Sequence, residues 1–387
     1  MRALLFSARA MHLWCLLLLL PSCVEPYMPE AISAAKSYLV VDGFINSQGT
    51  TTINLSRTYD LSAKTAPPVE TAATVSIEEE GGLRYPLREG STQGSYTSAS
   101  LVLNPSKQYH LLIRTSGGKE YASDYAPVKT TPPIDSAPWE VSDMNFSIHV
   151  NTHDNTNTTQ YYRWEYEETW ESRPDLVPVV EYLNDRIQDI RTPYPLVCWQ
   201  SAKSTAILLT NTIRLQQDVV SYFPLRSLPN TTDRLRYKYS ILVRQHALTE
   251  AEYAYWELLK KNTESIGTLF DPLPAQLTGN VHCLNDDSEL AFGYVGAHSV
   301  QEKRLFISRS ELPSWWPLRT GYEDCIPPDM VDNNPIQLAA TFKNNVLLPV
   351  RPVYDPATGA IIGYTYSVLE CVDCRKRGTA VRPSFWQ

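Results

Sequence analysis

The sequence has no apolar run long enough to cross a membrane as a helix. The first apolar run, Leu13–Leu20, covers about eight residues, whereas a membrane-spanning helix needs about 20. No later stretch is long and apolar enough. We therefore expect no transmembrane helix, and any attachment to a membrane needs another device.

Motifs of catalysis are also missing. The chain has no HExxH helix, no G-x-S-x-G elbow, no Walker loop and no G-x-G-x-x-G after a predicted strand. Such motifs hold nucleophiles, metal ligands or phosphate-binding backbone at fixed spacing. Without these motifs, the sequence offers no nucleophile–base set for a hydrolase. We expect no enzymatic activity, no cofactor and no metal.

Positive charge is scarce. Lys and Arg together number 34 against 42 Asp and Glu, which gives a formal net charge of -8. Binding to nucleic acid requires a basic face that neutralises phosphates. We expect no nucleic-acid partner.

The N-terminus has the features of a secretory signal. Arg2 and Arg9 precede or flank the start of the apolar run, and Leu20-Pro-Ser-Cys23 follows it. This ending is similar to a bacterial lipobox, with Leu three residues before the cysteine and Ser directly before it. We predict a signal peptide over 1–22, whose removal leaves Cys23 carrying acyl chains that anchor the protein to a membrane. The alternative is an ordinary signal peptide that contains Cys23 by chance.

The first part of the mature chain has the pattern of short strands. Residues 23–36 contain Pro26 and Pro29 and predict a short tether. The region 37–129 then holds roughly six or seven short β-like runs that end at turn residues, with no helical period between them. This region predicts a β-sandwich of immunoglobulin or transthyretin type.

A larger β-rich domain is predicted to follow. Residues 130–138, which are rich in proline, predict a semi-rigid linker, and the second domain covers 139–387. One amphipathic helix is predicted near 249–266, where Thr249 and Glu252 form a capping box before apolar residues at helical spacing. Its aromatic residues are predicted to pack against the sheet.

The strongest strand pattern of the chain lies at 161–170. Aromatic residues alternate there with charged ones, and we predict that Glu165, Glu167 and Glu168 form a solvent face with cross-strand ion pairs. The proline-containing segment 171–196 predicts a long surface excursion that is suited to contact a partner.

Cysteines are unusual in their number. The sequence has seven, and two of these are predicted to leave with the signal peptide or to carry lipid. The five that remain are Cys198, Cys283, Cys325, Cys371 and Cys374. Disulfides are the default in an exported protein, and an odd number leaves at least one thiol without a partner in the chain. We predict a bond from Cys325 to Cys371 or Cys374, and a bond between Cys198 and Cys283. A zinc site at Cys371 and Cys374 would need a second pair of ligands at matching spacing.

Two polar clusters contain residue types that can bind metal ions. His149 and His153 lie four residues apart near Asp154, but on a strand or loop this spacing does not make them converge as it would on a helix. The acidic turn 286–289 lacks the alternating ligands and the central glycine of a calcium loop. Both clusters are predicted to be solvated.

Taken together, several segments resemble a family of Bacteroidota cell-envelope lipoproteins that carry domain of unknown function 4249. The segments that carry the resemblance are Leu39–Gly43, Ala73–Ile77, Tyr109–Ile113 with Gly118 and Tyr121, Pro133–Ser136, Tyr162–Trp164, Tyr253–Trp256, Gly279–Asn280, Gly293–Tyr294, Asp373–Arg375, Gly378, Pro383 and Phe385–Trp386.

The resemblance implies a place in the cell and a partner, but no catalytic residues. It implies an outer-membrane lipoprotein, periplasmic or surface-exposed, with an N-terminal immunoglobulin-like sandwich. It also implies a TonB-dependent β-barrel transporter as a candidate partner. Asp135-Ser-Ala137 resembles a Bacteroidota O-glycosylation motif, so Ser136 is a candidate acceptor. The predicted function is therefore a binding or accessory module for such a transporter. The alternative is a surface adhesin or glycan-binding lipoprotein without one.

Overall fold

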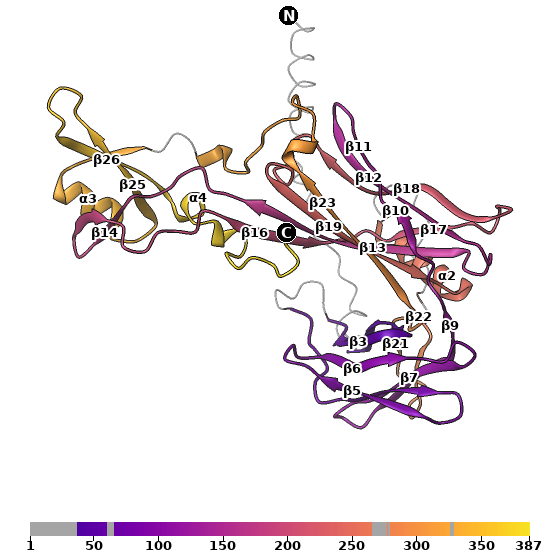
Figure 1. Ribbon diagram of the computed structural model, residues 1–387. Coiled ribbons are helices and arrows are strands. Elements are labelled where there is room, and N and C mark those ends of the chain that lie inside the picture. The colour runs from indigo at the N-terminus through magenta and orange to yellow at the C-terminus, as the bar shows by residue number, and fades with distance from the viewer. Residues whose placement is uncertain (1–36, 60–65, 265–276, 278, 326–328) are drawn as a thin grey trace, which may run out of the picture.

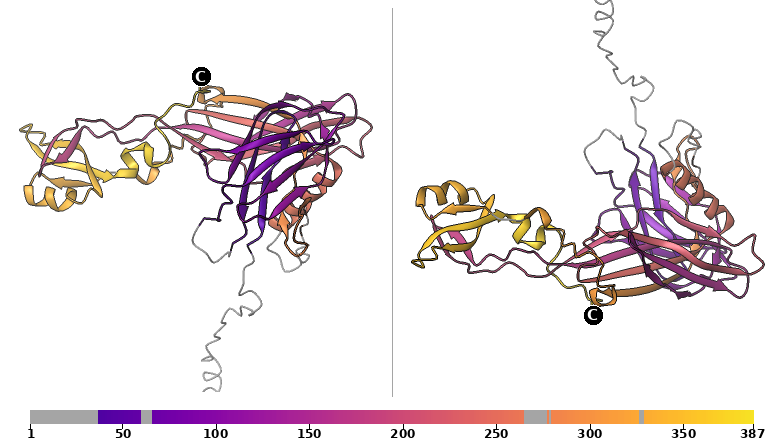
Figure 2. Two further views of the ribbon diagram at one scale, coloured as in Figure 1. Left: turned by 90° about the horizontal axis from the view of Figure 1, so that it is seen from below. Right: turned by 90° about the horizontal axis from the view of Figure 1, so that it is seen from above.

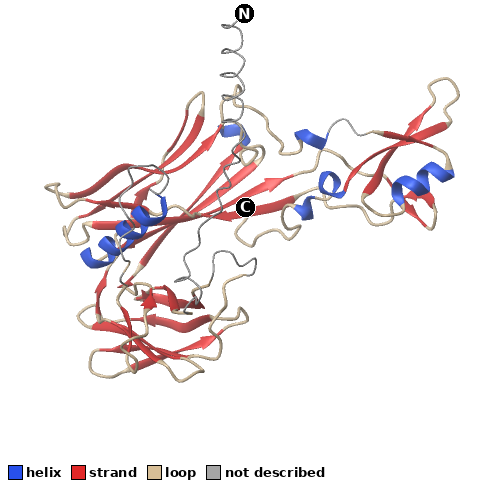
Figure 3. Cartoon of the chain, turned by 180° about the vertical axis from the view of Figure 1, so that it is seen from behind, coloured by secondary structure: helices blue, strands red, loops and turns tan. Residues whose placement is uncertain are grey.

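The computed structural model describes residues 37–59, 66–264, 277, 279–325 and 329–387. The predicted signal peptide 1–22, Cys23 and the tether 23–36 lie outside these residues. Within them the chain is mainly β, as predicted, and helices are few and short (Figures 1 and 3). In this described part, no helix is both long and apolar enough to cross a membrane.

Nine strands of the first region build the N-terminal sheet. They are β1 (Leu39–Gly43), β2 (Ile45–Asn46), β3 (Gln48–Arg57), β4 (Thr74–Glu79), β5 (Arg84–Glu89), β6 (Ser95–Val102), β7 (Gln108–Arg114), β8 (Glu120–Ser123) and β9 (Ala126–Lys129). Ile53 and Leu55 of β3 are buried while their neighbours Thr52 and Asn54 are exposed, which is the period of a half-buried strand. All nine strands contribute to one core. Together with three later strands they form one continuous hydrogen-bonded sheet, and an immunoglobulin- or transthyretin-like sandwich stays a prediction.

Three strands from the second predicted region complete the N-terminal sheet. β20 (Val281–Cys283) pairs with β8, β21 (Ala291–Phe292) runs parallel to β1, and β22 (Ala297–His298) lies between β2 and β9. The first domain is therefore not the single segment 37–129. Strand periodicity predicts that a run of residues is a strand but not which sheet edge it joins. The sequence therefore did not reveal that the chain returns to the N-terminal sheet at residues 281–298.

The return depends on close backbone contacts that only glycine allows. A Cβ at Gly293 would lie 2.0 Å from the carbonyl oxygen of Val41, and one at Gly279 would lie 1.8 Å from the carbonyl oxygen of Gly293. The Asn280 side chain then holds Val295 from both sides, accepting a hydrogen bond from its N–H at 2.8 Å and donating one to its carbonyl at 3.1 Å. These contacts fix the returning chain against β1.

The second region forms two sheets around a core of large aromatic and aliphatic side chains. One sheet contains β10 (Ile134–Ser136), β11 (Trp139–Val141), β12 (Asn145–Asp154) and β18 (Asp218–Pro229). The other, the β13 sheet, contains β13 (Tyr161–Ser172), β16 (Cys198–Lys203), β17 (Leu208–Asn211), β19 (Lys238–Ala247) and β23 (Val300–Ser308). The predicted helix is α2 (Glu250–Glu264), which directly follows β19.

The predicted linker 130–138 is part of this structure and not a spacer. Its residues 134–136 form β10, which pairs with β12. The N–H of Thr131 donates to the Ser299 hydroxyl at 2.9 Å, and the Thr131 hydroxyl accepts from the N–H of Ala247 at 3.0 Å. Proline keeps a segment extended, and here the extended segment lies beside strands with which it pairs.

One glutamate of β13 departs from the prediction. Glu168 does not face solvent, because it shares the inward-facing side of the strand with Trp164 and Tyr166. It is 2% exposed and forms ion pairs with Arg226 and Arg234. Strict alternation from Tyr166 already places position 168 on the core side.

A small satellite lobe stands away from the rest of the protein (Figure 2). It combines β14 (Val180–Leu183) and β15 (Arg186–Asp189) of the predicted excursion with β24 (Met330–Asp332), α3 (Pro335–Phe342), β25 (Leu347–Tyr354) and β26 (Ile361–Val368). These elements share a core that includes Val180, Phe342 and Tyr364. The predicted excursion therefore contributes two paired strands to a folded lobe. In the described ranges, the remaining short helices are η2 (Arg309–Glu311), η3 (Glu323–Cys325), α4 (Leu369–Val372) and η4 (Cys374–Lys376).

Two disulfides lie between the lobe and the rest of the protein: one joins β16 of the β13 sheet to η4, and the other joins η3 to α4. Of the two partners predicted for Cys325, the structure bonds Cys371. The predicted bond between Cys198 and Cys283 is wrong: Cys198 is bonded to Cys374, and Cys283 is a buried free thiol. Cys283 belongs to β20 and lies in the core of the N-terminal sheet, away from the end of β16 that carries Cys198.

Candidate functional site

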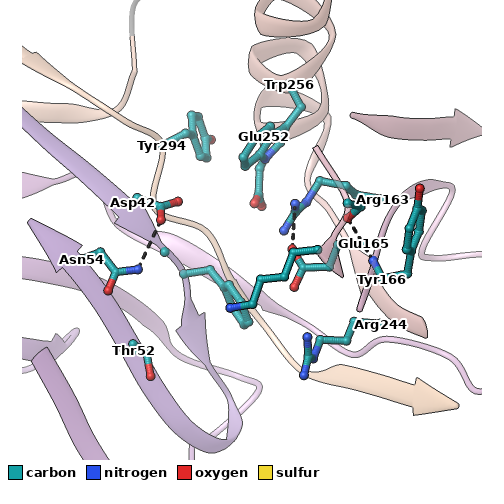
Figure 4. A pocket seen from close by; sticks show the side chains of 14 residues that line it. Asp42, Thr52, Asn54, Arg163, Glu165, Tyr166, Arg244, Glu252, Trp256 and Tyr294 are labelled. Carbon is teal, nitrogen blue, oxygen red and sulfur yellow. Dashed lines mark hydrogen bonds and ion pairs between the residues drawn. The ribbon is translucent and has the colours of Figure 1, made fainter. Parts of the chain in front are cut away.

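A cleft of about 300 Å³ lies between the N-terminal sheet and the β13 sheet, and α2 supplies part of its lining (Figure 4). Its lining comes from β1, β3, the β13 sheet, α2 and the returning chain at Tyr294. The lining residues are Asp42, Gly43, Phe44, Thr52, Asn54, Arg163, Glu165, Tyr166, Lys203, Ser204, Arg244, Glu252, Trp256 and Tyr294.

The N-terminal sheet contributes an acidic wall. Asp42 at the end of β1 is exposed, and its Oδ2 accepts a hydrogen bond from the Asn54 amide at 3.2 Å. The next residue, Gly43, has φ of 136°, and a Cβ there would lie 2.4 Å from the carbonyl oxygen of Thr52. The turn after Asp42 therefore requires glycine.

The β13 sheet contributes a wall with three cations. Arg163 lies 3.4 Å from Glu165, and Arg244 lies 2.7 Å from Glu302. Lys203 has no ion pair or side-chain hydrogen bond with the residues that the structure describes. In Figure 4, Arg163 and Arg244 lie on the opposite side of the cleft from Asp42.

The aromatic residues of α2 divide between packing and lining. Tyr253 packs on Tyr161 of the β13 sheet, with ring centroids 5.1 Å apart, in agreement with the prediction. Trp256 lines the cleft, and the Arg163 guanidinium lies 4.4 Å from its ring centroid. Such a cation–π contact holds both side chains in place.

Glu252 lies in the first turn of α2, and its side chain is buried. Its N–H donates to the Thr249 hydroxyl at 3.2 Å, which is the first half of the predicted capping box. The carboxylate is directed elsewhere, with Oε1 3.8 Å from Nε2 of His298. It also packs against Gly296, where a Cβ would lie 2.1 Å from Oε2. The second half of the capping box is therefore not formed among the described residues.

Two buried histidines lie behind the cleft. Phe44 stacks on His298 with centroids 4.2 Å apart and meets His246 edge-on at 5.2 Å. His246 is fully buried, lies 3.6 Å from Glu165, and neither of its ring nitrogens has a hydrogen bond to a described residue. Across the described ranges, no group of three or more His, Cys, Asp or Glu side chains has the arrangement of a metal site.

Burial and charge set the ionisation of this pair. Burial, aided by the charge of Arg163, lowers the pKa of His246 to about 3. Burial alone would raise the pKa of Glu165, but His246, Arg163 and Arg244 together outweigh it and lower that pKa to about 2. At neutral pH the imidazole is therefore neutral, and the two arginines face an ionised Glu165.

The structure also places the other residues that the sequence singled out. Ser136 lies in β10, half-buried, and its hydroxyl accepts a hydrogen bond from the Asn151 amide at 2.8 Å. Its place is therefore a paired strand and not an exposed linker. Cys371 and Cys374 are both in disulfides and form no zinc site.

The side chains of the two polar clusters, near His149 and in the acidic turn 286–289, are engaged in other contacts. His149 stacks on Tyr222, with centroids 4.0 Å apart, while His153 lies 2.7 Å from Asp135. In the acidic turn, Asp286 lies 3.5 Å from Lys119. Across the described residues, these contacts bring no set of three metal-binding side chains together.

Sequence reasoning missed the cleft because its residues lie far apart in the chain. Asp42, Arg163, Trp256 and Tyr294 come from four segments, and successive members of this set lie 121, 93 and 38 residues apart in the sequence. One signal was present, however. Each of the four segments is among those that carry the resemblance described for the sequence.

The fold and the cleft define a class of protein: a mainly β protein with a polar cleft, of a size suited to a small ligand, between two sheets. A family model described as "Domain of unknown function (DUF4249)" matches residues 24–304. The chain belongs to this family. Every residue that lines the cleft lies in the matched range, whereas β24, β25 and β26 of the satellite lobe lie outside it.

The other comparisons add little. No curated protein matches the chain. Among solved structures, the chitinase ChiA74 from Bacillus thuringiensis is similar at 12% identity with a TM-score of 0.15. The alignment covers 51% of this chain and 29% of the chitinase chain. A likeness this low carries no argument about fold or activity.

Proposed function

We propose that this protein is a lipid-anchored, non-enzymatic binding module of the bacterial outer membrane, which holds a small polar ligand in the cleft and accompanies a TonB-dependent transporter. The ligand would be captured in the cleft and handed to the transporter. Cys23 would carry the anchor, and residues 23–36 would join it to the first described residue, Ser37.

The convergence of separate segments on the cleft carries this proposal. Leu39–Gly43, Tyr162–Trp164, Tyr253–Trp256 and Gly293–Tyr294 each supply at least one lining residue. The same segments carry the resemblance to envelope lipoproteins of Bacteroidota. Binding sites combine shape with a few well-placed polar groups, and this cleft has charged and aromatic groups from both sheets.

The satellite lobe supports the accessory role. It projects from the body, and several of its large apolar side chains are exposed, among them Ile336 at 80% and Tyr354 at 56%. Apolar side chains gathered at the surface are a common feature of protein contact sites. The lobe would therefore contact the transporter while the cleft holds the ligand.

Co-purification tests the transporter assignment. An affinity-tagged full-length chain is isolated from detergent-solubilised envelopes, and its partners are identified by mass spectrometry. We expect a TonB-dependent β-barrel in the eluate. Its yield should be weaker with Ile336→Asp on the lobe than with Val381→Asp, which changes a similarly exposed aliphatic side chain outside the lobe. An eluate without a β-barrel would argue against the accessory role. Glycan binding by the soluble chain without a transporter would favour the adhesin.

Membrane fractionation tests the anchor. Cys23→Ala removes the acylation site, so we expect the variant in the soluble periplasmic fraction and no incorporation of radiolabelled palmitate. The matched control, Cys15→Ala, lies inside the predicted signal peptide and should leave anchoring unchanged. Unchanged membrane association of the Cys23→Ala chain would refute the anchor.

A further inference from the structure

The two walls of the cleft carry opposite charges that have no charged partner in the described part of the chain. Asp42, on the N-terminal sheet, has a hydrogen bond from the neutral Asn54 amide and no ion pair. Lys203, on β16, has neither an ion pair nor a side-chain hydrogen bond. Both are exposed at the cleft. A ligand with an ammonium group and a carboxylate would meet both charges at once.

The remaining charges of the cleft balance. Arg163 is paired with Glu165, and Arg244 is paired with Glu302 outside the lining. Counted formally, the lining has three basic side chains and three acidic ones, so an uncharged or zwitterionic ligand leaves the site neutral. A ligand of one sign would leave an uncompensated charge in a partly enclosed space, which is costly.

The aromatic rings distinguish a zwitterion from a neutral sugar. A sugar ring stacks on an open aromatic face, but Trp256 carries Arg163 over its ring and Tyr294 packs against Tyr255, with centroids 5.5 Å apart. Tyr166 is 7% exposed. The charged side chains of this cleft without an ion pair to a described residue are Asp42 and Lys203, and the rings of Trp256, Tyr294 and Tyr166 act as walls.

We propose, on the assumption that the cleft is the ligand site, that it takes a zwitterion of the amino-acid class, a free amino acid or a short peptide. The ligand's ammonium group lies at Asp42 and its carboxylate lies at Lys203. The volume of about 300 Å³ is at the lower end for ligand pockets, which suits a small ligand. The module then serves the uptake of peptides or amino acids.

The test uses the soluble Cys23→Ala chain and native mass spectrometry with three pools: free amino acids, dipeptides, and oligosaccharides such as cellobiose. We expect a subset of dipeptides to be retained, and calorimetry then gives the affinity of the tightest one. Acetylation of its amino group or amidation of its carboxyl group should each weaken binding roughly tenfold or more, because each removes a charge-assisted contact. Asp42→Asn should weaken binding of the free dipeptide by the same factor, and this variant should bind the free and N-acetylated forms equally well. Lys203→Met should also weaken binding of the free dipeptide, and this variant should bind the free and amidated forms equally well.

Matched controls and the contrary outcomes separate the two proposals. Asp287→Asn and Lys376→Met remove exposed charges away from the cleft and should leave affinity unchanged. Retention of oligosaccharides but of no amino acid or dipeptide overturns the ligand class and leaves a binding function in place. Retention of no compound from any pool overturns both the ligand class and the proposed binding function. Dipeptide binding without co-purification of a β-barrel supports the ligand class and removes the transporter assignment. Dipeptide affinity unaffected by Asp42→Asn and Lys203→Met places the ligand elsewhere and overturns the inference.

Discussion

Glu168→Gln is expected to destabilise the second region strongly. The Glu168 carboxylate is 3% exposed and joins three groups: Arg226 at 3.1 Å, Arg234, and the hydroxyl of Tyr239, which donates at 2.7 Å. The amide keeps the shape of the side chain but removes its charge. Two guanidinium groups then lie beside a site that can no longer neutralise them.

The structure sets the size of this effect. Breaking a buried ion pair costs about 3–5 kcal/mol, because it leaves an uncompensated charge in a poorly solvated place. Arg226 and Arg234 are each about one quarter exposed, so water can solvate part of their charge. We therefore expect a loss near the lower limit, about 3 kcal/mol in the free energy of unfolding.

Urea unfolding followed by tryptophan fluorescence measures this loss. Trp170 is a local reporter, since the Arg234 guanidinium lies 4.3 Å from its ring centroid. Glu167→Gln is the matched control: it makes the same change one residue earlier on the half-exposed face, where the pair with Arg244 is 3.7 Å long and should contribute less than about 1 kcal/mol. Equal losses in the two variants would refute the reasoning. A double-mutant cycle with Arg234→Met should show a coupling of roughly 1–3 kcal/mol.

Three further predictions concern the rest of the fold. Cys198→Ser removes the bond to Cys374, which closes 176 residues, and should lower the free energy of unfolding by roughly 4–5 kcal/mol in urea; a non-reduced peptide map that joins Cys198 to another cysteine would contradict it. Gly293→Ala should cost at least about 2 kcal/mol more than Gly118→Ala, because both positions have positive φ but only the first adds a collision with β1; equal costs would refute the close crossing. The lowered pKa of His246 means that, as pH falls from 6.5 to 3, the unfolded chain gains a proton that the folded one does not, so stability should fall by up to about 1.4 kcal/mol per pH unit. His246→Phe should flatten this slope between pH 7 and 4, and an unchanged slope would contradict the assignment.

Much of the local structure followed from the sequence. The period of two at Ile53 and Leu55 and the helical spacing after Thr249 predicted elements that the structure has. These patterns report which side of an element is buried, and the core fills from those sides. The bond from Cys325 to Cys371 was one of two pairings that the sequence left open.

The candidate site was beyond such reasoning. Asp42 and Lys203 have nothing in their local sequence that marks them as neighbours, and neither belongs to a known catalytic or metal-binding motif. They face one cleft because the returning chain, held by the glycine contact at Gly293, completes the N-terminal sheet beside the β13 sheet. The resemblance marked the segments but not their meeting point.

The sequence by itself determined that the chain is mainly β, that its net charge is negative and that it has no apolar run long enough for a membrane-spanning helix. Composition and the periodicity of neighbouring residues are sufficient for these three conclusions. The tertiary structure alone decided that residues 281–298 close the first sheet, that Cys374 and not Cys283 bonds Cys198, and that the predicted linker is a strand. Each of these depends on which distant segments become neighbours. That choice is made by the packing of whole sheets around their cores, where the free energy of burying many side chains outweighs any preference of a single segment.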